Sequence, residues 1–142
     1  MFATAEAGAA AENDAFEVSA LVRAIEVFDR LFDLLERGAA CRFPNRQLVL
    51  RSTPEREVLA TRVCGRLTAQ LPDLELVREP LDQQYYNGLR FMFYAQSRAG
   101  ASVPIGDGGL FDWVAQLTSN RRFRFVSSGF GLQLAPVLFG PE

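Results

Sequence analysis

The segment from Glu17 to Gly38 places the strongest constraint on how this chain can fold. Its large apolar side chains recur at alternating spacings of four and three residues, at Leu21, Ile25, Phe28, Phe32 and Leu35. Charged residues fill many of the positions between them, and a glycine ends the run. This period predicts a long amphipathic helix. Packing of the apolar stripe against a sheet is the expected use, and docking on a partner protein is the alternative.

The next segments alternate between strand and helix patterns. Residues 47–51 are typical of a strand, and residues 74–78 alternate as a second strand. Between them, a helix is predicted to begin at Ser52-Thr53-Pro54 and to stop before Pro72. This strand–helix–strand order suits a parallel crossover, although an antiparallel arrangement would also satisfy it.

The second half of the chain contains mainly strand patterns. A polar turn with a glycine at residues 97–100 separates the two strands of a predicted hairpin. A helix is expected from Leu110 to about Asn120, a half-exposed strand over 122–126 and a short apolar helix over 129–139. Together these patterns predict an α+β fold with a mainly antiparallel sheet flanked by helices.

Length and composition predict a single domain. The chain has 142 residues, of which 49% are hydrophobic, and a net charge of −2. Residues 1–16 are Ala-rich and carry no apolar stripe, so they are expected to form a disordered tail before one domain over 17–142. The nearly neutral charge gives no reason to expect nucleic acid as a partner.

The expected location of the chain is the cytoplasm. No apolar run approaches the roughly 20 residues that span a bilayer, so no membrane association is expected. The N-terminus has no basic residue before an apolar stretch, so a secretory signal is not predicted. Cys41 and Cys64 are too few for a disulfide framework and lack metal-ligand spacing.

Two residue types are absent and limit the possible chemistry. The chain has no histidine, which removes Ser-His and Cys-His nucleophile pairs and most zinc sites. All 15 basic residues are arginine, so neither a Schiff base nor a phosphate-loop lysine is available. Carboxylates, tyrosines and arginines remain, and these bind anions and amines well. We expect no metal and no cofactor.

The stretch QYYNGLRFMF, residues 84–93, is the most unusual part of the sequence. Adjacent tyrosines on a strand point to opposite faces of the sheet. One ring of the pair Tyr85 and Tyr86 could therefore support the core while the other faces a ligand cavity. The alternative, one ring in the core and one at the surface with no ligand, fits the pattern equally well.

Three segments in this order resemble elements of the histidyl-tRNA synthetase family. They are Leu76-Val77-Arg78 with Leu81-Asp82 and Tyr85-Tyr86-Asn87 ("LVRGLDYYN" in the family), Gly108-Gly109-Leu110-Phe111-Asp112 ("GGRYD") and Ser128-Gly129-Phe130-Gly131-Leu132 (the start of motif 3). The resemblance covers residues 73–139 and implies the C-terminal half of a class II aminoacyl-tRNA synthetase core. The regulatory subunit of ATP phosphoribosyltransferase shares these elements without charging tRNA.

The resemblance implies a ligand site made by Arg78, Tyr85, Tyr86, Gly108 and Gly109. Phenol hydroxyls suit recognition of an imidazole or an amine. Paired glycines before a helix would expose free N–H groups to an anion at the positive end of the helix dipole. A tight strand-to-helix turn without a ligand is the alternative for the glycine pair.

Several departures from the family pattern indicate lost catalysis. Arg78 lies seven residues before Tyr85, whereas the family arginine lies four before, and an odd shift along a strand moves a side chain to the opposite face unless a bulge absorbs it. The arginine and tyrosine of "GGRYD" are Leu110 and Phe111, and the motif 3 arginine falls on Pro136. Nothing in residues 1–72 matches motif 1 or motif 2.

Three functions follow from this resemblance. The first is a non-catalytic regulatory or scaffolding subunit, similar to the ATP phosphoribosyltransferase regulatory subunit, that forms a homodimer or pairs with a partner such as the catalytic phosphoribosyltransferase subunit. The second is a module that binds histidine or another amino acid at Tyr85 or Tyr86. The third is a ligase that activates an amino acid for an acceptor other than tRNA. A fortuitous resemblance in a stand-alone domain is the remaining alternative.

Overall fold

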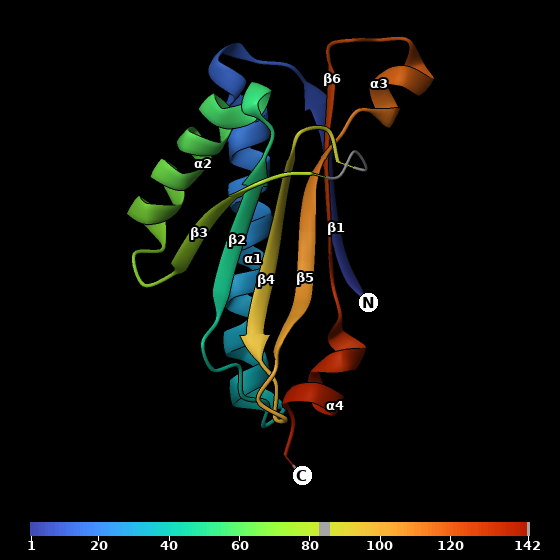
Figure 1. Cartoon of the computed structure of the whole chain (residues 1–142). Coiled ribbons are helices and arrows are strands. Elements are labelled where there is room, and N and C mark those ends of the chain that lie inside the picture. The colour runs from blue at the N-terminus through green and yellow to red at the C-terminus, as the bar shows by residue number, and fades with distance from the viewer. Residues whose placement is uncertain (83–85, 142) are drawn as a thin grey trace.

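The computed structural model describes residues 1–82 and 86–141 and contains one six-stranded sheet with helices packed against it (Figure 1). The strand order is β1-β6-β5-β4-β2-β3. The strands are β1 (Phe2–Ala9), β2 (Gln47–Ser52), β3 (Glu75–Pro80), β4 (Leu89–Gln96), β5 (Ser102–Phe111) and β6 (Phe123–Phe130). The helices are α1 (Ala15–Gly38), α2 (Glu57–Gln70), α3 (Trp113–Thr118) and α4 (Ala135–Phe139), with short 3-10 turns before α1, α2 and α4.

The sheet is mainly antiparallel, which confirms the predicted α+β class. Among the strands of the described residues, only β2 and β3 pair in parallel, and α2 connects them. The parallel crossover is therefore the correct interpretation of the strand–helix–strand pattern. All the other neighbouring strands pair antiparallel, including the predicted hairpin of β4 and β5.

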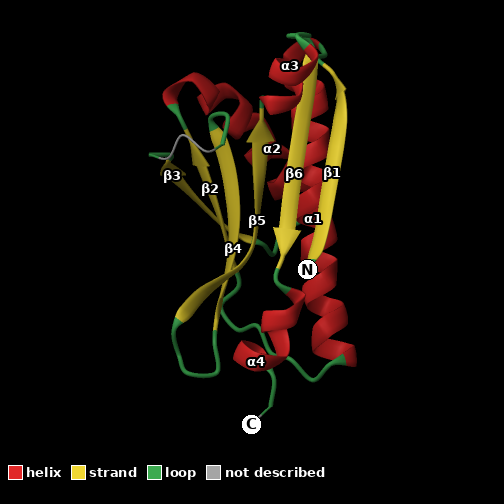
Figure 2. Cartoon of the chain, turned by 90° about the vertical axis from the view of Figure 1, so that its right-hand side faces the viewer, coloured by secondary structure: helices red, strands yellow, loops and turns green. Residues whose placement is uncertain are grey.

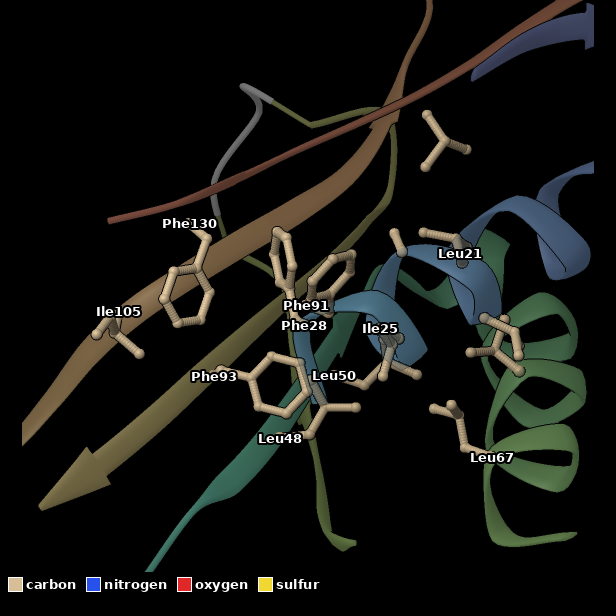
Figure 3. Close-up of a cluster of buried hydrophobic side chains, with 14 of the residues drawn as sticks. Leu21, Ile25, Phe28, Leu48, Leu50, Leu67, Phe91, Phe93, Ile105 and Phe130 are labelled. Atoms are coloured by element: carbon tan, nitrogen blue, oxygen red, sulfur yellow. The ribbon is translucent and has the colours of Figure 1, made fainter. Parts of the chain in front are cut away.

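Helices α1 and α2 cover one face of the sheet, and no long helix in the part of the chain that the structure describes covers the other face (Figure 2). The apolar stripe of α1 is buried and forms the centre of the core, as the sequence predicted. Phe28 lies in the middle, with ring centroids 5.3 Å from Phe130, 6.0 Å from Phe91 and 6.3 Å from Phe2 and Phe93 (Figure 3). Strands β1, β4 and β6 thus each bring an aromatic ring to one helix residue.

The prediction of a disordered tail over residues 1–16 is wrong, because residues 2–9 form strand β1. This strand pairs with β6 along its whole length. Its even-numbered side chains are half-buried and its odd-numbered ones exposed, with Phe2 against Phe28 and Glu6 bound to Arg23 at 2.8 Å. The exposed positions are alanine, which hides the alternation from a pattern based on hydrophobicity.

Two of the predicted helices are shorter than expected. Strand β5 continues through Phe111, so the helix predicted from Leu110 begins only at Trp113. Strand β6 continues through Phe130, and the helix predicted over 129–139 is reduced to a 3-10 turn and α4. Leu110 and Phe111 pair with β6, and the end of β6 pairs with both β1 and β5. This pairing satisfies backbone groups that a helix would otherwise satisfy.

Among the residues that the structure describes, no helix is long and apolar enough to cross a membrane.

Glu17 is a buried carboxyl group at the start of α1, with only 3% of its side chain exposed. Burial raises the pKa of Glu17 above its ordinary value, and Arg124, with Nε 3.5 Å from Oε1, opposes this rise. Because its pKa is raised, the folded protein favours the protonated Glu17 carboxyl group. As the pH rises, this group must ionise in a buried position, and the stability that the protonated form contributed is lost. This group's contribution to the free energy of unfolding should therefore decrease from acidic to neutral pH.

The variant Glu17→Gln should make the free energy of unfolding less dependent on pH, because an amide cannot titrate. Urea denaturation at several pH values between about 4 and 7 measures this slope. The exposed Glu12→Gln variant is the control and should keep the wild-type slope. An unchanged slope in Glu17→Gln would show that this carboxyl group titrates normally.

Candidate functional site

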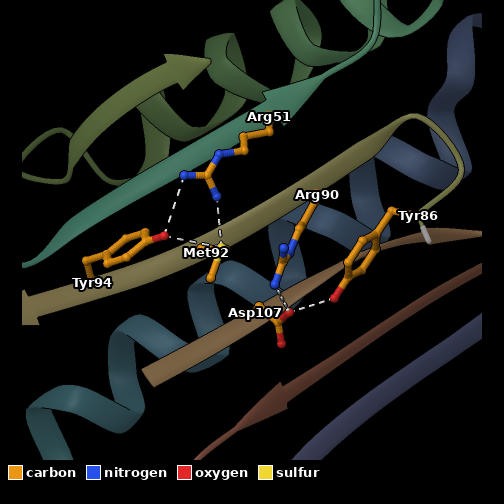
Figure 4. Close-up of polar contacts among 6 residues, drawn as sticks. All are labelled: Arg51, Tyr86, Arg90, Met92, Tyr94 and Asp107. Carbon is orange, nitrogen blue, oxygen red and sulfur yellow. Dashed lines mark hydrogen bonds and ion pairs between the residues drawn. The ribbon is translucent and has the colours of Figure 1, made fainter. Parts of the chain in front are cut away.

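The face of the sheet opposite α1 and α2 carries a row of polar side chains from its central strands (Figure 4). Directly opposed residues in an antiparallel pair share a face. Arg51 of β2 opposes Arg90 of β4, and Met92 of β4 opposes Asp107 of β5. Tyr94 lies two residues beyond Met92 on the same face. We refer to the surface formed by Arg51, Arg90, Met92, Tyr94 and Asp107 as the open face.

Asp107 is the centre of a compact polar group that we call the Asp107 cluster, made by Tyr86, Arg90 and Asp107. The Tyr86 hydroxyl donates to Asp107 Oδ2 at 2.6 Å, and Arg90 Nη2 donates to the same oxygen at 2.9 Å. The Arg90 guanidinium also lies 5.0 Å from the centroid of the Tyr86 ring. Three mutual contacts hold the carboxylate and the cation in one geometry.

Arg51 provides a second fixed cation on the open face. Its Nε lies 3.0 Å from Glu79 Oε2 on β3, and its Nη1 donates to Met92 Sδ at 2.9 Å. Its Nη2 also reaches the Tyr94 hydroxyl at 3.5 Å. The contact with Tyr94, followed by that with Glu79, raises the pKa of Arg51. The guanidinium is therefore charged throughout the physiological pH range and held on both sides.

Two hollows adjoin one another on the open face. The larger, about 490 Å³, is lined by Arg51, Glu79, Pro80, Leu81, Asp82, Arg90, Met92 and Tyr94. The smaller, about 320 Å³, lies beside the end of β6, and Asp107 is among its lining residues. Arg90 and Met92 line both hollows. Both volumes fall in the range of small-molecule sites, roughly 300 to 1,000 Å³.

This arrangement offers opposite charges to one ligand. The Asp107 carboxylate can accept hydrogen bonds from an ammonium group, and the Arg51 guanidinium can donate to a carboxylate. The Asp107 side chain is 35% exposed and that of Arg90 18% exposed. Both groups are therefore accessible to a ligand, although most of their surface is shielded from water. Charged contacts there are stronger than in bulk water.

Tyr86 is the one predicted tyrosine that the structure places, because Tyr85 lies outside the described residues. The Tyr86 ring is buried against Phe111, with centroids 4.9 Å apart, and its hydroxyl is used by Asp107. Tyr86 is therefore a positioning residue for the carboxylate. The sequence singled out this residue but did not indicate the acid that it holds.

Arg78 lies on the opposite face of the sheet from the Asp107 cluster. Its Nη2 binds Glu57 Oε2 at 2.7 Å, and its Nη1 donates to Thr61 Oγ1 at 3.2 Å, both on α2. This placement agrees with the change of face that the odd shift in spacing predicts. The structure thus does not bring Arg78 together with Tyr86.

Gly108 and Gly109 lie inside strand β5, so neither the strand-to-helix turn nor the anion site at a helix start is present. They oppose Ser128 and Ser127 of β6. A Cβ on Gly109 would lie 2.6 Å from the Tyr86 ring and 2.3 Å from the Leu89 carbonyl oxygen. A Cβ on Gly108 would strike the Phe91 ring in the core. These glycines make room for neighbouring rings.

The sequence contained a signal for the residues that were missed. Arg90, Met92 and Tyr94 alternate with buried residues along β4, so they share one face. Asp107 is an aspartate between two glycines in a strand, where all these residue types are disfavoured. A carboxylate in such a position indicates a specific role. Across residues 1–82 and 86–141, no group of three or more metal-ligating side chains is arranged to hold an ion.

Two solved structures with a similar fold come from aminoacyl-tRNA synthetases. Apo histidyl-tRNA synthetase from S. aureus matches 99% of this chain with a TM-score of 0.65 and 15% identity, and 41% of that chain is covered. The RNA-binding domain of threonyl-tRNA synthetase from Cryptosporidium parvum Iowa II matches 85% of this chain with a TM-score of 0.55 and 14% identity, and 32% of that chain is covered. The chain therefore spans about two-fifths or less of the lengths of these two synthetases.

Comparison of the amino-acid sequence with known families and curated proteins identifies no relative. No protein-family model and no curated protein matches the sequence. At 14 and 15% identity the structural likeness describes the fold alone. The open sheet with helices on one face is, on this likeness, a class II aminoacyl-tRNA synthetase-like fold.

Proposed function

We propose that this chain is a non-catalytic binding module that holds a small amino acid on the open face. The observation that supports this proposal is the Asp107 cluster, in which Tyr86 and Arg90 fix a partly exposed carboxylate beside a hollow. A carboxylate held in advance loses little conformational freedom when a ligand binds, which favours affinity.

The two ends of an amino acid match the two parts of the open face. Tyr86 and Arg90 both contact Oδ2 of Asp107, so Oδ1 is the oxygen that we assign to the ligand ammonium. The ligand carboxylate faces Arg51 in the larger hollow, beyond the boundary that Arg90 and Met92 form between the two hollows. The ligand side chain extends into the smaller hollow, where Pro104 and Leu134 supply exposed apolar surface.

Binding without activation is the part of the proposal that separates this chain from a synthetase. Formation of an adenylate requires cations that neutralise the developing phosphoryl charge, each worth roughly 3 kcal/mol of transition-state stabilisation. Arg78, the arginine that the resemblance assigned to the site, binds Glu57 on the opposite face. Arg90 is held by Asp107, and we assign Arg51 to the ligand carboxylate, so neither is left to neutralise a phosphoryl group. We therefore expect no amino-acid-dependent pyrophosphate exchange.

A thermal-shift screen with the twenty amino acids tests the binding proposal. At a hundredfold excess over the dissociation constant, one of them should raise the melting temperature by about 6 °C. The variant Asp107→Asn should lower the affinity for that amino acid by about tenfold or more, because a charged hydrogen bond is lost. Tyr86→Phe retains the carboxylate and should weaken binding less.

The control for this screen is Asp73→Asn, which removes an exposed carboxyl group away from the open face. It should bind the same amino acid as tightly as the wild type. Absence of a shift with every amino acid, or an equal loss of affinity in both aspartate variants, would reject the proposal.

A regulatory or scaffolding subunit is the second candidate, favoured by the outer edge of β1. This strand lies at the end of the sheet, and in the described part of the chain only β6 pairs with it. Its one charged residue, Glu6, is bound to Arg23, so no free charge protects the edge from pairing with another strand. The partner would be a second copy or a catalytic subunit of the ATP phosphoribosyltransferase kind. A monodisperse monomer in sedimentation at high micromolar concentration, with no co-purifying partner, would reject this candidate.

A further inference from the structure

A cavity of about 590 Å³ lies at the end of the sheet that is uppermost in Figure 1. It is formed where the end of β5, helix α3 and the start of β6 meet. Its lining consists of Arg56, Asn87, Phe111, Asp112, Ala115, Gln116, Ser119, Arg121, Phe123 and Arg124. None of these residues lines the two hollows of the open face, so this cavity is a separate place on the molecule.

Three arginines give the cavity its character. Arg124 is held in place, since Nη1 donates to the carbonyl oxygens of Arg121 and Phe123 at 2.7 and 3.0 Å. Its Nε lies 3.5 Å from buried Glu17, behind the lining. Arg56 and Arg121 form no ion pair with any residue that the structure describes. The lining thus carries three arginines against one carboxylate, that of Asp112.

The remaining lining is aromatic and polar. Phe111 and Phe123 are half-buried and contribute apolar surface, and one side of the Phe111 ring is already supported by Tyr86. The single carboxylate of the lining, Asp112, accepts a hydrogen bond from Gln116 Nε2 at 2.7 Å. The cavity therefore combines several guanidinium groups with ring surfaces on which a planar group can stack.

We propose that this cavity binds a phosphorylated aromatic small molecule of the size of a nucleoside monophosphate. Arg56, Arg121 and Arg124 would hold the phosphate, because guanidinium groups donate paired hydrogen bonds to its oxygens. Phe111 and Phe123 would contact the planar ring. A volume of about 590 Å³ suits a ligand of this class. The proposal stands independently of amino-acid binding on the open face.

Calorimetric titration of the full chain with AMP, adenosine and inorganic phosphate tests this inference in moderate salt. AMP should bind at least tenfold more tightly than either adenosine or phosphate, since only AMP uses both parts of the cavity. Arg121→Gln and Arg56→Gln should each lower the affinity for AMP about tenfold or more, the effect expected for loss of a charged hydrogen bond. Asp107→Asn should bind AMP normally, which separates this site from the open face.

The matched control is Arg122→Gln, an exposed arginine next to Arg121 that does not line the cavity. It should leave AMP affinity unchanged, and melting curves of the three arginine variants should confirm that each one folds. The inference is overturned if AMP gives no heat. It is also overturned if AMP and phosphate bind equally, or if Arg122→Gln weakens AMP as much as Arg121→Gln.

Discussion

Replacement of Phe28 by alanine should lower the free energy of unfolding by about 4 kcal/mol, within the range measured for aromatic truncations in protein cores. The Phe28 ring is fully buried and contacts rings from β1, β4 and β6. Truncation would leave a cavity bounded by several strands, which cannot collapse without changing the twist of the sheet. Urea denaturation followed by far-UV circular dichroism measures the loss.

The adjacent residue supplies the control for this change. Val27 lies on the outer side of α1 and is 39% exposed, so Val27→Ala should change the free energy of unfolding by no more than about 0.5 kcal/mol. A loss below about 1 kcal/mol in Phe28→Ala would show that α1 does not pack on the sheet through this residue.

Substitution of Gly109 by alanine should cost about 3 kcal/mol, at the upper end of the usual range for overpacking. The added Cβ would lie 2.3 Å from the Leu89 carbonyl oxygen and 2.6 Å from the Tyr86 ring. A backbone atom cannot rotate away, so β4 and β5 must separate locally. The Tyr86 hydroxyl would then move from Asp107, and amino-acid binding on the open face should weaken together with stability.

Gly65 is the matched glycine for this experiment. It lies inside α2, and no other side chain comes within 4 Å of the place that an added Cβ would occupy. Gly65→Ala should therefore stabilise the protein by about 1 kcal/mol through helix propensity. Guanidinium denaturation of both variants gives the comparison. Equal effects in the two variants, or a stable Gly109→Ala that binds like the wild type, would contradict the close packing described for β5.

Regular patterns in the sequence were sufficient to predict much of the fold. The stripe of α1 keeps the helical period from Leu21 to Leu35, and the β2–α2–β3 unit is punctuated by Pro54 and Pro72. Strand β1 was missed because its side chains do not alternate between apolar and polar. Its exposed positions are all alanine, and its half-buried side includes the polar residues Thr4 and Glu6. Its pairing with β6 also depends on residues at the other end of the chain.

The candidate site was harder to predict because its geometry depends on pairing between strands. Tyr86 could be chosen from its neighbourhood in the sequence, but its partner Asp107 lies 21 residues away. The register of β4 against β5 shifts between Phe93 and Tyr94, and no local pattern predicts such an irregularity. Gly108 and Gly109 were expected before a helix because their role, making room for Phe91 and Tyr86, depends on neighbouring strands.

Nuclear magnetic resonance titration tests the central claim, that the open face around Asp107 binds an amino acid, most directly. The ¹⁵N-labelled chain would be titrated with L-histidine and separately with each of the other amino acids. We expect saturable shifts of backbone amides in residues 89–94 and 105–109, and their loss in Asp107→Asn. Absence of saturable shifts with every amino acid, or shifts confined to α1 and α2, would contradict the claim.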